Sequence, residues 1–415
     1  MKSHKLLSLI AAISFSLLCA FSVSPVLAAS AAYPAGTPVI KNESKLLPPP
    51  EVVELEEMWR AGGEDSEVLF GHIFRALADS EDNVYLLDTQ LSEVQVFSPS
   101  GDHLKTLSRE GEGPGESREP ADLTMMPDQT LGILQRFPGK VVKVTLDGIP
   151  AGDVALGDAA SGGFNALYTG RCSGSNLLLV AQYVTRDDNG QTRIWYVSRF
   201  DAEGNELARC WERATAVDFA NPVIREADIL DPVIFACEAA SDGRVYLAPD
   251  RYNYAVHVYD PDGSLHHVIE REFQVRHRNE MEIGRVQSVF DVWTSGRPVA
   301  PETEVETIAT TISALYVDDQ NSLWVENSRS AQAGPAGAMF TYDIFSEDGK
   351  FDRQVTFSCE GNHEDDQLFR VSDDMVVLIK GSIPAIYASM AGGAQDIDED
   401  MEAEMMEVIC FRIPH

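Results

Sequence analysis

The sequence predicts an all-β protein in which one four-stranded unit is repeated six times around a ring. A short apolar strand recurs after a turn rich in Asp, Asn, Ser or Gly. Each copy follows another strand-like run and precedes an alternating strand, and five of the alternating strands end in a hairpin signal. Four antiparallel strands repeated in this way are typical of the blades of a β-propeller. The copies of the apolar strand occupy residues 79–88, 127–135, 172–182, 241–250, 318–327 and 372–381.

The apolar copy is expected to be the second strand of each blade. In a propeller this strand is covered on both faces by neighbouring blades, so its side chains are apolar throughout rather than alternating. VYLL at 84–87, LGIL at 131–134 and VVLI at 376–379 fit that pattern. The turns SPSGD at 98–102 and DPDGS at 260–264, set between β-branched and aromatic runs, predict the hairpin from third to fourth strand.

The sixth copy predicts how the ring closes. Its third strand, residues 408–413, runs into the C-terminus, and no fourth strand follows. An orphan strand-like segment at 52–59 precedes the first copy, and its pairing with the sixth blade would leave no sheet edge bare. We therefore expect a six-bladed β-propeller over residues 51–415, closed by pairing of the N-terminal strand with the C-terminal strands. A seventh blade would need a further copy inside 213–232 or 273–309, and neither range carries a hairpin signal.

The N-terminal segment predicts export. Residues 1–28 have the positive start, apolar stretch and small-residue cleavage site of a secretory signal peptide, and residues 29–50 form a Pro-rich linker. We expect a periplasmic or extracellular protein without membrane insertion. Five cysteines follow the signal peptide without CxxC or CxxH spacing, and we expect most of them to be small buried hydrophobes.

The charge balance limits the class of partner. Asp and Glu number 66 against 32 Lys and Arg, a formal charge of −34. Such a field repels phosphate backbones and anionic lipid, so nucleic-acid binding is excluded and a small molecule, peptide, glycan or protein is expected. A closed ring has no free sheet edge that demands oligomerisation, so a monomer is expected.

The loop after the first blade carries a family resemblance. Residues 111–116 read GEGPGE, and together with the six repeats they make the chain resemble the exported bacterial six-bladed β-propellers of the NHL-repeat type. The resemblance covers roughly residues 51–415 and implies the fold. Members of the group usually follow the GxGPGE loop with an aromatic residue, whereas this chain has Ser117. GEGPGE lacks the Gly-Lys-Ser/Thr ending of a phosphate loop, so nucleotide binding is not indicated.

Two long insertions, 211–232 and 273–309, predict a binding face. They map to the face where ligand sites of this fold usually lie, by analogy of fold. The second insertion is basic, and the segment from Arg285 to Trp293 predicts a short helix. An arginine cluster there would hold a carboxylate or sulfate ligand; the alternative is a lid tied to acidic blade edges by exposed ion pairs. The candidate binding residues are Arg251, Tyr252, Tyr254, Arg276, His277, Arg278, Arg285 and Trp293.

The ends of the second strands predict a possible calcium site. Asp250, Glu326 and Asn327 offer the hard oxygen ligands that calcium prefers. The gluconolactonase-like six-bladed hydrolases, a related group, hold a metal with Glu, Asn and Asp, and similarity to them would imply the same use of these three residues. The alternative is that Asp and Asn act as ordinary turn formers. An acidic run at 396–407 has EF-hand-like spacing without the glycine or the helices, and we expect it to be a solvated hairpin insertion.

The sequence leaves two functions open. The first is a ligand- or protein-binding module that acts through its channel face, favoured because no catalytic signature is strong. The alternative is a metal-assisted hydrolase or lyase, with calcium or zinc, of the gluconolactonase-like or peptidyl-hydroxyglycine-lyase-like kind. The lyases use a His-ligated metal, but no HxH or HxxxH pair occurs on one element of this sequence.

Overall fold

The structure confirms the repeated all-β architecture. The computed structural model describes residues 33–43, 49–64, 66, 68–156, 163–297, 300–333, 338–392 and 405–414. These residues belong to one compact unit, Ala32–His415. The predicted signal peptide and most of the acidic run at 396–407 lie outside the described residues. Within the described ranges, no helix is both long and apolar enough to span a lipid bilayer.

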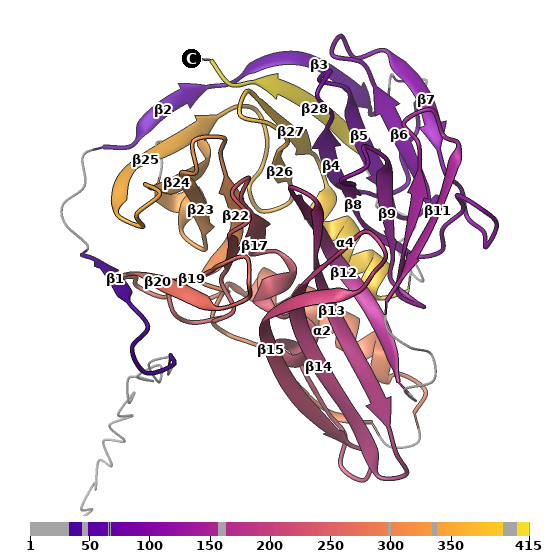
Figure 1. Cartoon of the computed structure of the whole chain (residues 1–415), viewed down its shortest axis with the longest axis vertical. Helices are drawn as coiled ribbons and strands as arrows, with labels where there is room; N and C mark the ends of the chain where they lie inside the picture. The colour runs from indigo at the N-terminus through magenta and orange to yellow at the C-terminus, as the bar shows by residue number, and fades with distance from the viewer. Residues whose placement is uncertain are drawn as a thin grey trace, which may run out of the picture. The chain divides into compact units, whose positions relative to one another are not determined.

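The first three blades are four-stranded antiparallel sheets in chain order. Blade one contains β4 (Ile73–Ala78), β5 (Val84–Asp88), β6 (Glu93–Phe97) and β7 (His103–Leu107). Blade two contains β8 (Pro120–Met125), β9 (Leu131–Gln135), β10 (Lys140–Val144) and β11 (Pro150–Ala155). Blade three has longer strands and projects beyond the others (Figure 1); it contains β12 (Phe164–Ser173), β13 (Asn176–Arg186), β14 (Gly190–Phe200) and β15 (Glu206–Asp218).

The last three blades repeat the order, with additions at their outer edges. Blade four contains β17 (Cys237–Ala239), β18 (Val245–Leu247), β19 (Ala255–Tyr259) and β20 (Leu265–Arg271). Blade five contains β22 (Ile312–Val317), β23 (Leu323–Asn327), β24 (Ala338–Phe345) and β25 (Phe351–Ser358). Blade six contains β26 (Gln367–Arg370), β27 (Met375–Ile379), β28 (Glu407–Arg412) and, as its outermost strand, β3 (Glu56–Gly62).

The ring closes where the sequence predicts it. β3 pairs antiparallel with β28, with Trp59 opposite Cys410 and Gly62 opposite Glu407 (Figure 1). The backbone groups at the edge of β28 are therefore satisfied by the N-terminal part of the chain, as in other closed sheets. The indole of Trp59 stacks on Phe97 of blade one with ring centroids 5.2 Å apart, so the closing strand also packs against the next blade.

Two further strands were not predicted. β1 (Val39–Asn42) pairs in parallel with β20, so part of the segment predicted as a linker is a fifth strand of blade four. β2 (Glu51–Glu54) pairs in parallel with β25, so the orphan segment at 52–59 is divided between blades five and six. The sequence carries no signal for these pairings because a parallel partner lies more than 200 residues away and shares no turn with it.

The hydrophobic core is divided into clusters that lie between neighbouring blades. Val84 and Leu86 of β5 pack with blade six, whereas Tyr85 and Leu87 of the same strand pack with blade two. Equivalent clusters join blades two and three, three and four, four and five, and five and six. Each second strand thus supplies apolar side chains to two clusters, which is why its central residues are apolar at successive positions rather than at alternate ones.

The cysteines are packing residues, as expected. Cys210, Cys237 and Cys410 are buried, Cys172 and Cys359 are half-buried, and none of these five forms a disulfide. Burial raises the pKa of Cys210 to about 11 and that of Cys410 to about 12. At neutral pH these thiols stay protonated, so they are poor nucleophiles and poor metal ligands.

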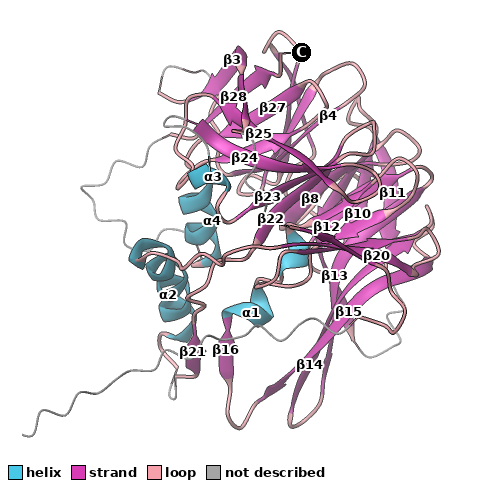
Figure 2. Cartoon of the chain, turned by 90° about the vertical axis from the view of Figure 1, so that its left-hand side faces the viewer, coloured by secondary structure: helices cyan, strands magenta, loops and turns pink. Residues whose placement is uncertain are grey.

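The helices gather on one face of the ring, which we call the helix face (Figure 2). It is formed by the connections from each fourth strand to the next blade and from each second to third strand. It carries β16 (Val223–Arg225), α1 (Glu226–Ile229), η2 (Pro232–Ile234), α2 (Glu280–Thr294), β21 (Glu302–Glu304), α3 (Ser330–Ala333) and α4 (Ser382–Met390). The helix predicted from Arg285 to Trp293 is confirmed as the C-terminal part of α2.

The GEGPGE loop lies on the same face and folds back on itself. The Glu116 carboxylate accepts a hydrogen bond from the Gly113 amide at 2.9 Å and pairs with Arg109 at 2.6 Å. Gly115 has a φ of +76°, which favours glycine, and a Cβ atom at Gly111 would lie 2.0 Å from Glu116 Oε2, so the Glu116 side chain would have to move. The Gly113 amide is thus already occupied by a carboxylate of the chain.

Trp59→Ala tests the closure. Trp59 is 7% exposed and packs in the cluster between blades six and one, so its truncation leaves a cavity between the first and last segments. We expect the free energy of unfolding, measured by guanidinium denaturation, to fall by about 3–5 kcal/mol. Val52→Ala, in the exposed part of β2, is the control and should change it little. Equal losses in the two variants would contradict a structural role for the closure.

Candidate functional site

The helix face concentrates the exposed apolar side chains. Thirteen large apolar residues are exposed in the described part of the chain, and nine lie in connections of this face. The nine are Leu69, Leu91, Phe137, Phe219, Phe235, Tyr252, Met281, Val292 and Met405. The other four are Val52, Leu104, Ile149 and Leu207. A clustering of exposed apolar groups on one face is a mark of interaction surfaces.

Part of this face is covered by a lid, which consists of β16, α1, α2, β21 and α4. Val286, Val289 and Phe290 of α2 are buried at its centre. The crevice that α2 forms with α1 and α4 is too narrow for a water molecule. The Trp293 indole N–H donates to the Met390 carbonyl at 2.7 Å and so joins α2 to α4. The lid is therefore a packed substructure with a small core of its own.

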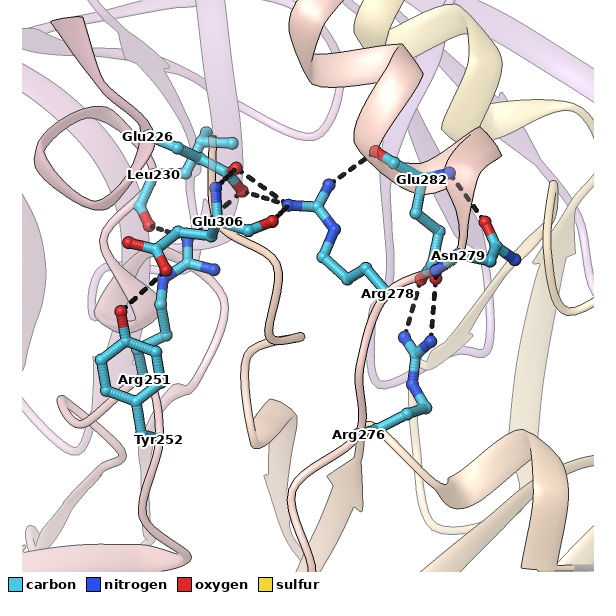
Figure 3. A network of polar contacts seen from close by, with 9 residues as sticks. All are labelled: Glu226, Leu230, Arg251, Tyr252, Arg276, Arg278, Asn279, Glu282 and Glu306. Atoms are coloured by element: carbon cyan, nitrogen blue, oxygen red, sulfur yellow. Dashed lines mark hydrogen bonds and ion pairs between the residues drawn. The ribbon is translucent and has the colours of Figure 1, made fainter. Parts of the chain in front are cut away.

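A buried carboxylate holds the lid to the propeller (Figure 3). Glu226, at the start of α1, is 3% exposed. Arg278 Nη1 donates to both of its oxygens, at 2.9 and 2.8 Å, and the Glu306 amide donates to Oε2 at 3.0 Å. Arg251, which follows blade four's second strand, lies 3.4 Å away on the other side. A buried charge needs such partners, because without them its desolvation would not be compensated.

The second insertion is ordered by a capped helix. Asn279 caps α2: its side chain accepts from the Glu282 amide, and the Glu282 carboxylate accepts from the Asn279 amide. The same carboxylate pairs with Arg276 through two contacts, at 2.7 and 2.9 Å. Arg285, one turn further on, binds the Glu364 carbonyl at 2.8 Å and the Asp365 carboxylate of the connection into blade six. The arginines therefore position α2 over the ring.

These contacts decide between the two interpretations of the basic insertion. The guanidinium groups of Arg251, Arg276, Arg278 and Arg285 are engaged by carboxylates of the chain itself, which is the lid interpretation. Arg276 pairs with Glu282 within the second insertion, and Arg285 pairs with Asp365 of the connection into blade six. The central carboxylate, Glu226, is buried and belongs to the lid.

The aromatic candidates have different environments. Tyr254 is 3% exposed and its hydroxyl donates to Asp343 at 2.8 Å, so it is a core residue rather than an anchor for a ligand. Tyr252 is exposed, and its hydroxyl donates to Glu306 at 2.8 Å. Trp293 is half-buried inside the lid, and His277 is exposed. Of the four, Tyr252 and His277 present surface to solvent on the helix face.

The three predicted calcium ligands are occupied by other contacts. The Asp250 carboxylate accepts from the amides of Tyr252 and Asn253 and from the Asn253 side chain. Glu326 accepts from Ser313 and Tyr342, and burial raises the pKa of its carboxyl group. These side chains act as a turn former and a core group, so the donor set does not fit calcium. Across the described ranges, no cluster of three or more His, Cys, Asp or Glu side chains is arranged to hold a metal ion.

The Asn327 side chain completes a buried network rather than a metal site. Its amide donates to Asp343 at 3.0 Å, and its carbonyl oxygen accepts from the Arg329 amide at 2.9 Å. Asp343 also pairs with Arg271 and accepts from Gln354 at 2.8 Å. The network joins blades four and five beneath the helix face.

Sequence reasoning missed a charged chain along the channel. Arg75, Asp122, Arg171 and Glu238 lie on the first strands of blades one to four, which line the centre of a propeller. Arg75 Nε lies 3.3 Å from Asp122, Arg171 Nη1 2.9 Å from Asp122, and Arg171 Nε 3.2 Å from Glu238. One charged residue inside each of these four first strands was the available signal.

Glu226 was also missed, for a different reason. It is one of several acidic residues in an irregular insertion, with Asp228 and Asp231 close by in sequence. Its two arginine partners are 25 and 52 residues away. No local pattern distinguishes it from a solvated glutamate, since only the docking of α2 buries it.

Comparisons with known proteins found similar solved structures. No protein-family model and no curated protein sequence matches the chain. A putative exported protein from Bacteroides fragilis NCTC 9343 is 11% identical with a TM-score of 0.47, over 91% of this chain and 100% of that one. Regucalcin, a calcium-binding protein from Agrobacterium tumefaciens strain C58, is 11% identical with a TM-score of 0.41, over 88% and 96%. Virginiamycin B lyase from Staphylococcus aureus is 9% identical with a TM-score of 0.38, over 86% and 99%.

Glu226→Ala tests the attachment of the lid. The change leaves Arg278 and Arg251 without their shared carboxylate, and we expect the local opening of α2 to become about 3–5 kcal/mol easier. Hydrogen–deuterium exchange of residues 276–306 measures this directly. Glu304→Ala removes an exposed ion pair with Arg225 and is the control. Equal exchange in the two variants would contradict the role of Glu226.

Calcium and EDTA test the metal interpretation. Because the oxygens of Asp250, Glu326 and Asn327 already have partners, we expect the melting temperature to be unmoved by calcium or by the chelator. A bound metal at a hundredfold excess over its Kd would add about 2.7 kcal/mol of stability. A clear rise in melting temperature with calcium, reversed by EDTA, would contradict this expectation.

Proposed function

We propose that the protein is a non-catalytic recognition module that binds its ligand or partner on the helix face. The observation that carries the proposal is the concentration of exposed apolar side chains in the connections of that face. Residues in a folded monomer's surface loops are mostly polar, and a one-sided excess of exposed Phe, Leu and Met side chains favours an interaction role. The rigid ring supplies a platform, and the connections supply the contacting residues.

The polar groups of the face support recognition rather than catalysis. The carboxylates and guanidinium groups of the lid neutralise one another, and Glu226 is surrounded by donors on three sides. A general acid or base needs room within hydrogen-bond distance of a substrate. Glu226 is buried under the lid and lacks that room. These groups therefore fit a structural task, while the exposed apolar residues around them remain available.

The compartment and family type are part of the same proposal. A signal peptide at 1–28 would deliver the module to the periplasm or beyond, and the GEGPGE loop supports membership of the NHL-repeat type of propeller. The formal charge of −34 disfavours polyanionic partners. We therefore place a small molecule, a peptide, a glycan or a protein on the helix face, with the chain acting as a monomer.

A fragment screen tests the proposal. A library of small acids, sugars and short peptides is screened by ligand-observed NMR against the full mature chain. We expect the fragments that bind to lose binding in the double variant Phe137→Ser/Phe235→Ser, which removes two exposed aromatic rings from the helix face. The matched control, Leu104→Ser/Ile149→Ser, removes two exposed apolar side chains outside the helix face, and the fragments should still bind to it.

One result of the same screen would contradict the proposal. Fragments that bind the helix-face double variant as well as the natural chain would show that this face is not the binding surface. Hydrogen–deuterium exchange with a bound fragment gives a second readout, and protection confined to 98–102 or 260–264, on the opposite face, would have the same meaning.

A further inference from the structure

Among the described residues, Arg136 in the connection after β9 and Arg193 on β14 have no carboxylate partner. In the described part of the chain, no carboxylate lies within 4.0 Å of the guanidinium group of Arg136 or Arg193, and neither side chain makes a hydrogen bond. Acidic residues outnumber basic ones by 66 to 32, so most arginines of this protein find a partner easily. Arg193 Nε is buried without a partner, which is costly unless another group satisfies it. These two arginines therefore differ from those of the lid.

Both arginines lie near the same tyrosine. The Arg136 guanidinium carbon is 5.4 Å from the centre of the Tyr168 ring. Arg193 precedes Trp195 by two residues on β14, so the two side chains leave the sheet on the same face, and the Tyr168 ring packs on Trp195. Burial raises the pKa of Tyr168, and the charges of Arg136 and Arg193 oppose that rise. Tyr168 is the extra residue of a β-bulge in β12, between Leu167 and Thr169, and its ring packs on Trp195 at 4.5 Å. Bulges commonly redirect a side chain next to a functional site.

The backbone fixes this arrangement from two sides. The Leu167 amide donates to the Arg136 carbonyl at 3.1 Å, which ties the turn after β9 to β12. The Thr169 hydroxyl donates to the Ile234 carbonyl at 2.6 Å, which brings η2 and the following Phe235 to the other side of the strand. The cations are thus held by blades two and three rather than by a free loop.

An apolar surface borders the two cations. Phe137 follows Arg136 directly, is 49% exposed, and packs edge-on against Phe164 with centroids 4.9 Å apart. Phe235 is 42% exposed. The nearest acidic group of η2, Asp231, is paired with Arg213 at 2.7 Å, so its charge is compensated. Positive charge next to open aromatic rings suits a ligand that has one anionic end and an apolar body.

We propose that Arg136, Arg193 and Tyr168 form a subsite for the carboxylate of a small organic anion whose apolar part rests on Phe137. The inference rests on the proposed recognition function and adds the chemical class of its ligand. Two guanidinium groups bind a carboxylate through charge-assisted hydrogen bonds, and the Tyr168 hydroxyl donates a further one. Polyanions are disfavoured by the acidic surface of the rest of the chain.

N-acetyl-L-phenylalanine is the probe, and its neutral amide is the control ligand. Isothermal titration calorimetry on the full mature chain should show that the acid binds. The affinity of the amide should be lower by about tenfold or more, since the amide lacks the charge. Sodium acetate has the charge without the ring, and its affinity should also be lower than that of the acid by about tenfold or more. Equal affinity for acid and amide, or no binding of the acid at millimolar concentration, overturns the subsite.

Three arginine variants locate the site. Arg136→Gln and Arg193→Gln should each weaken binding of the acid by about tenfold or more. Arg186→Gln is the matched control: Arg186 lies on blade three like Arg193, has no carboxylate partner among the described residues, and its replacement should leave the affinity unchanged. Melting temperatures of the variants check that they are folded, and Trp195 fluorescence gives a second binding signal because its ring contacts Tyr168. Natural affinity in both Arg136→Gln and Arg193→Gln overturns the subsite.

The outcomes separate this subsite from the broader proposal. If fragments of the general screen lose binding in Phe137→Ser/Phe235→Ser while the acid fails to bind the natural chain, or binds Arg136→Gln and Arg193→Gln with natural affinity, the recognition face stands and the subsite is wrong. If the arginine variants lose the acid while the general fragments bind Phe137→Ser/Phe235→Ser unchanged, the subsite stands, and recognition is confined to it rather than spread over the exposed apolar residues of the helix face.

Discussion

The structure depends on the sharing of each second strand between two neighbouring blades. The side chains of β5 alternate between the cluster with blade six and the cluster with blade two, and every other blade follows the same rule. A blade therefore has no complete core of its own, and a missing neighbour would expose half of its apolar strand. The ring must close for the first and last blades to be stable, and β3 supplies that closure by pairing with β28 and stacking Trp59 on Phe97.

Ring closure also determines where variable chain can be placed. Because all fourth-to-first and second-to-third connections emerge on one side, the insertions at 219–236 and 272–311 and the helix after β27 meet there. They do not remain separate loops, since α2 and α4 bury a small apolar core with α1. The acidic composition of the chain then provides carboxylates for the lid's arginines, and Glu226 joins two segments of the lid to blade four. Most of the positive charge on this face is consequently neutralised.

The functional proposals rest on the side chains of this region that the ion pairs of the lid do not engage. Of the arginines between 271 and 285, which the sequence indicates most strongly, Arg276, Arg278 and Arg285 hold the lid, and Arg271 joins blades four and five. Arg136 and Arg193 are less conspicuous in the sequence, yet no carboxylate of the described residues pairs with them. A cation without a partner in an acidic protein is a more specific indication of a ligand than a cluster of cations, because a cluster is readily paired internally.

The sequence by itself determined the repeat, the number of blades, the all-apolar second strands and the closure between the two ends of the chain. These features depend on local periodicity and on turn residues, which act within a few positions. It did not determine the parallel additions β1 and β2, the division of segment 52–59, or the occupation of Asp250, Glu326 and Asn327 by other groups. Those contacts join segments of the chain that no turn connects. Whether a charged side chain is paired or free depends on which distant segment packs against it, and only the tertiary structure decides that, since burial and Coulomb energy depend on distance in space rather than along the chain.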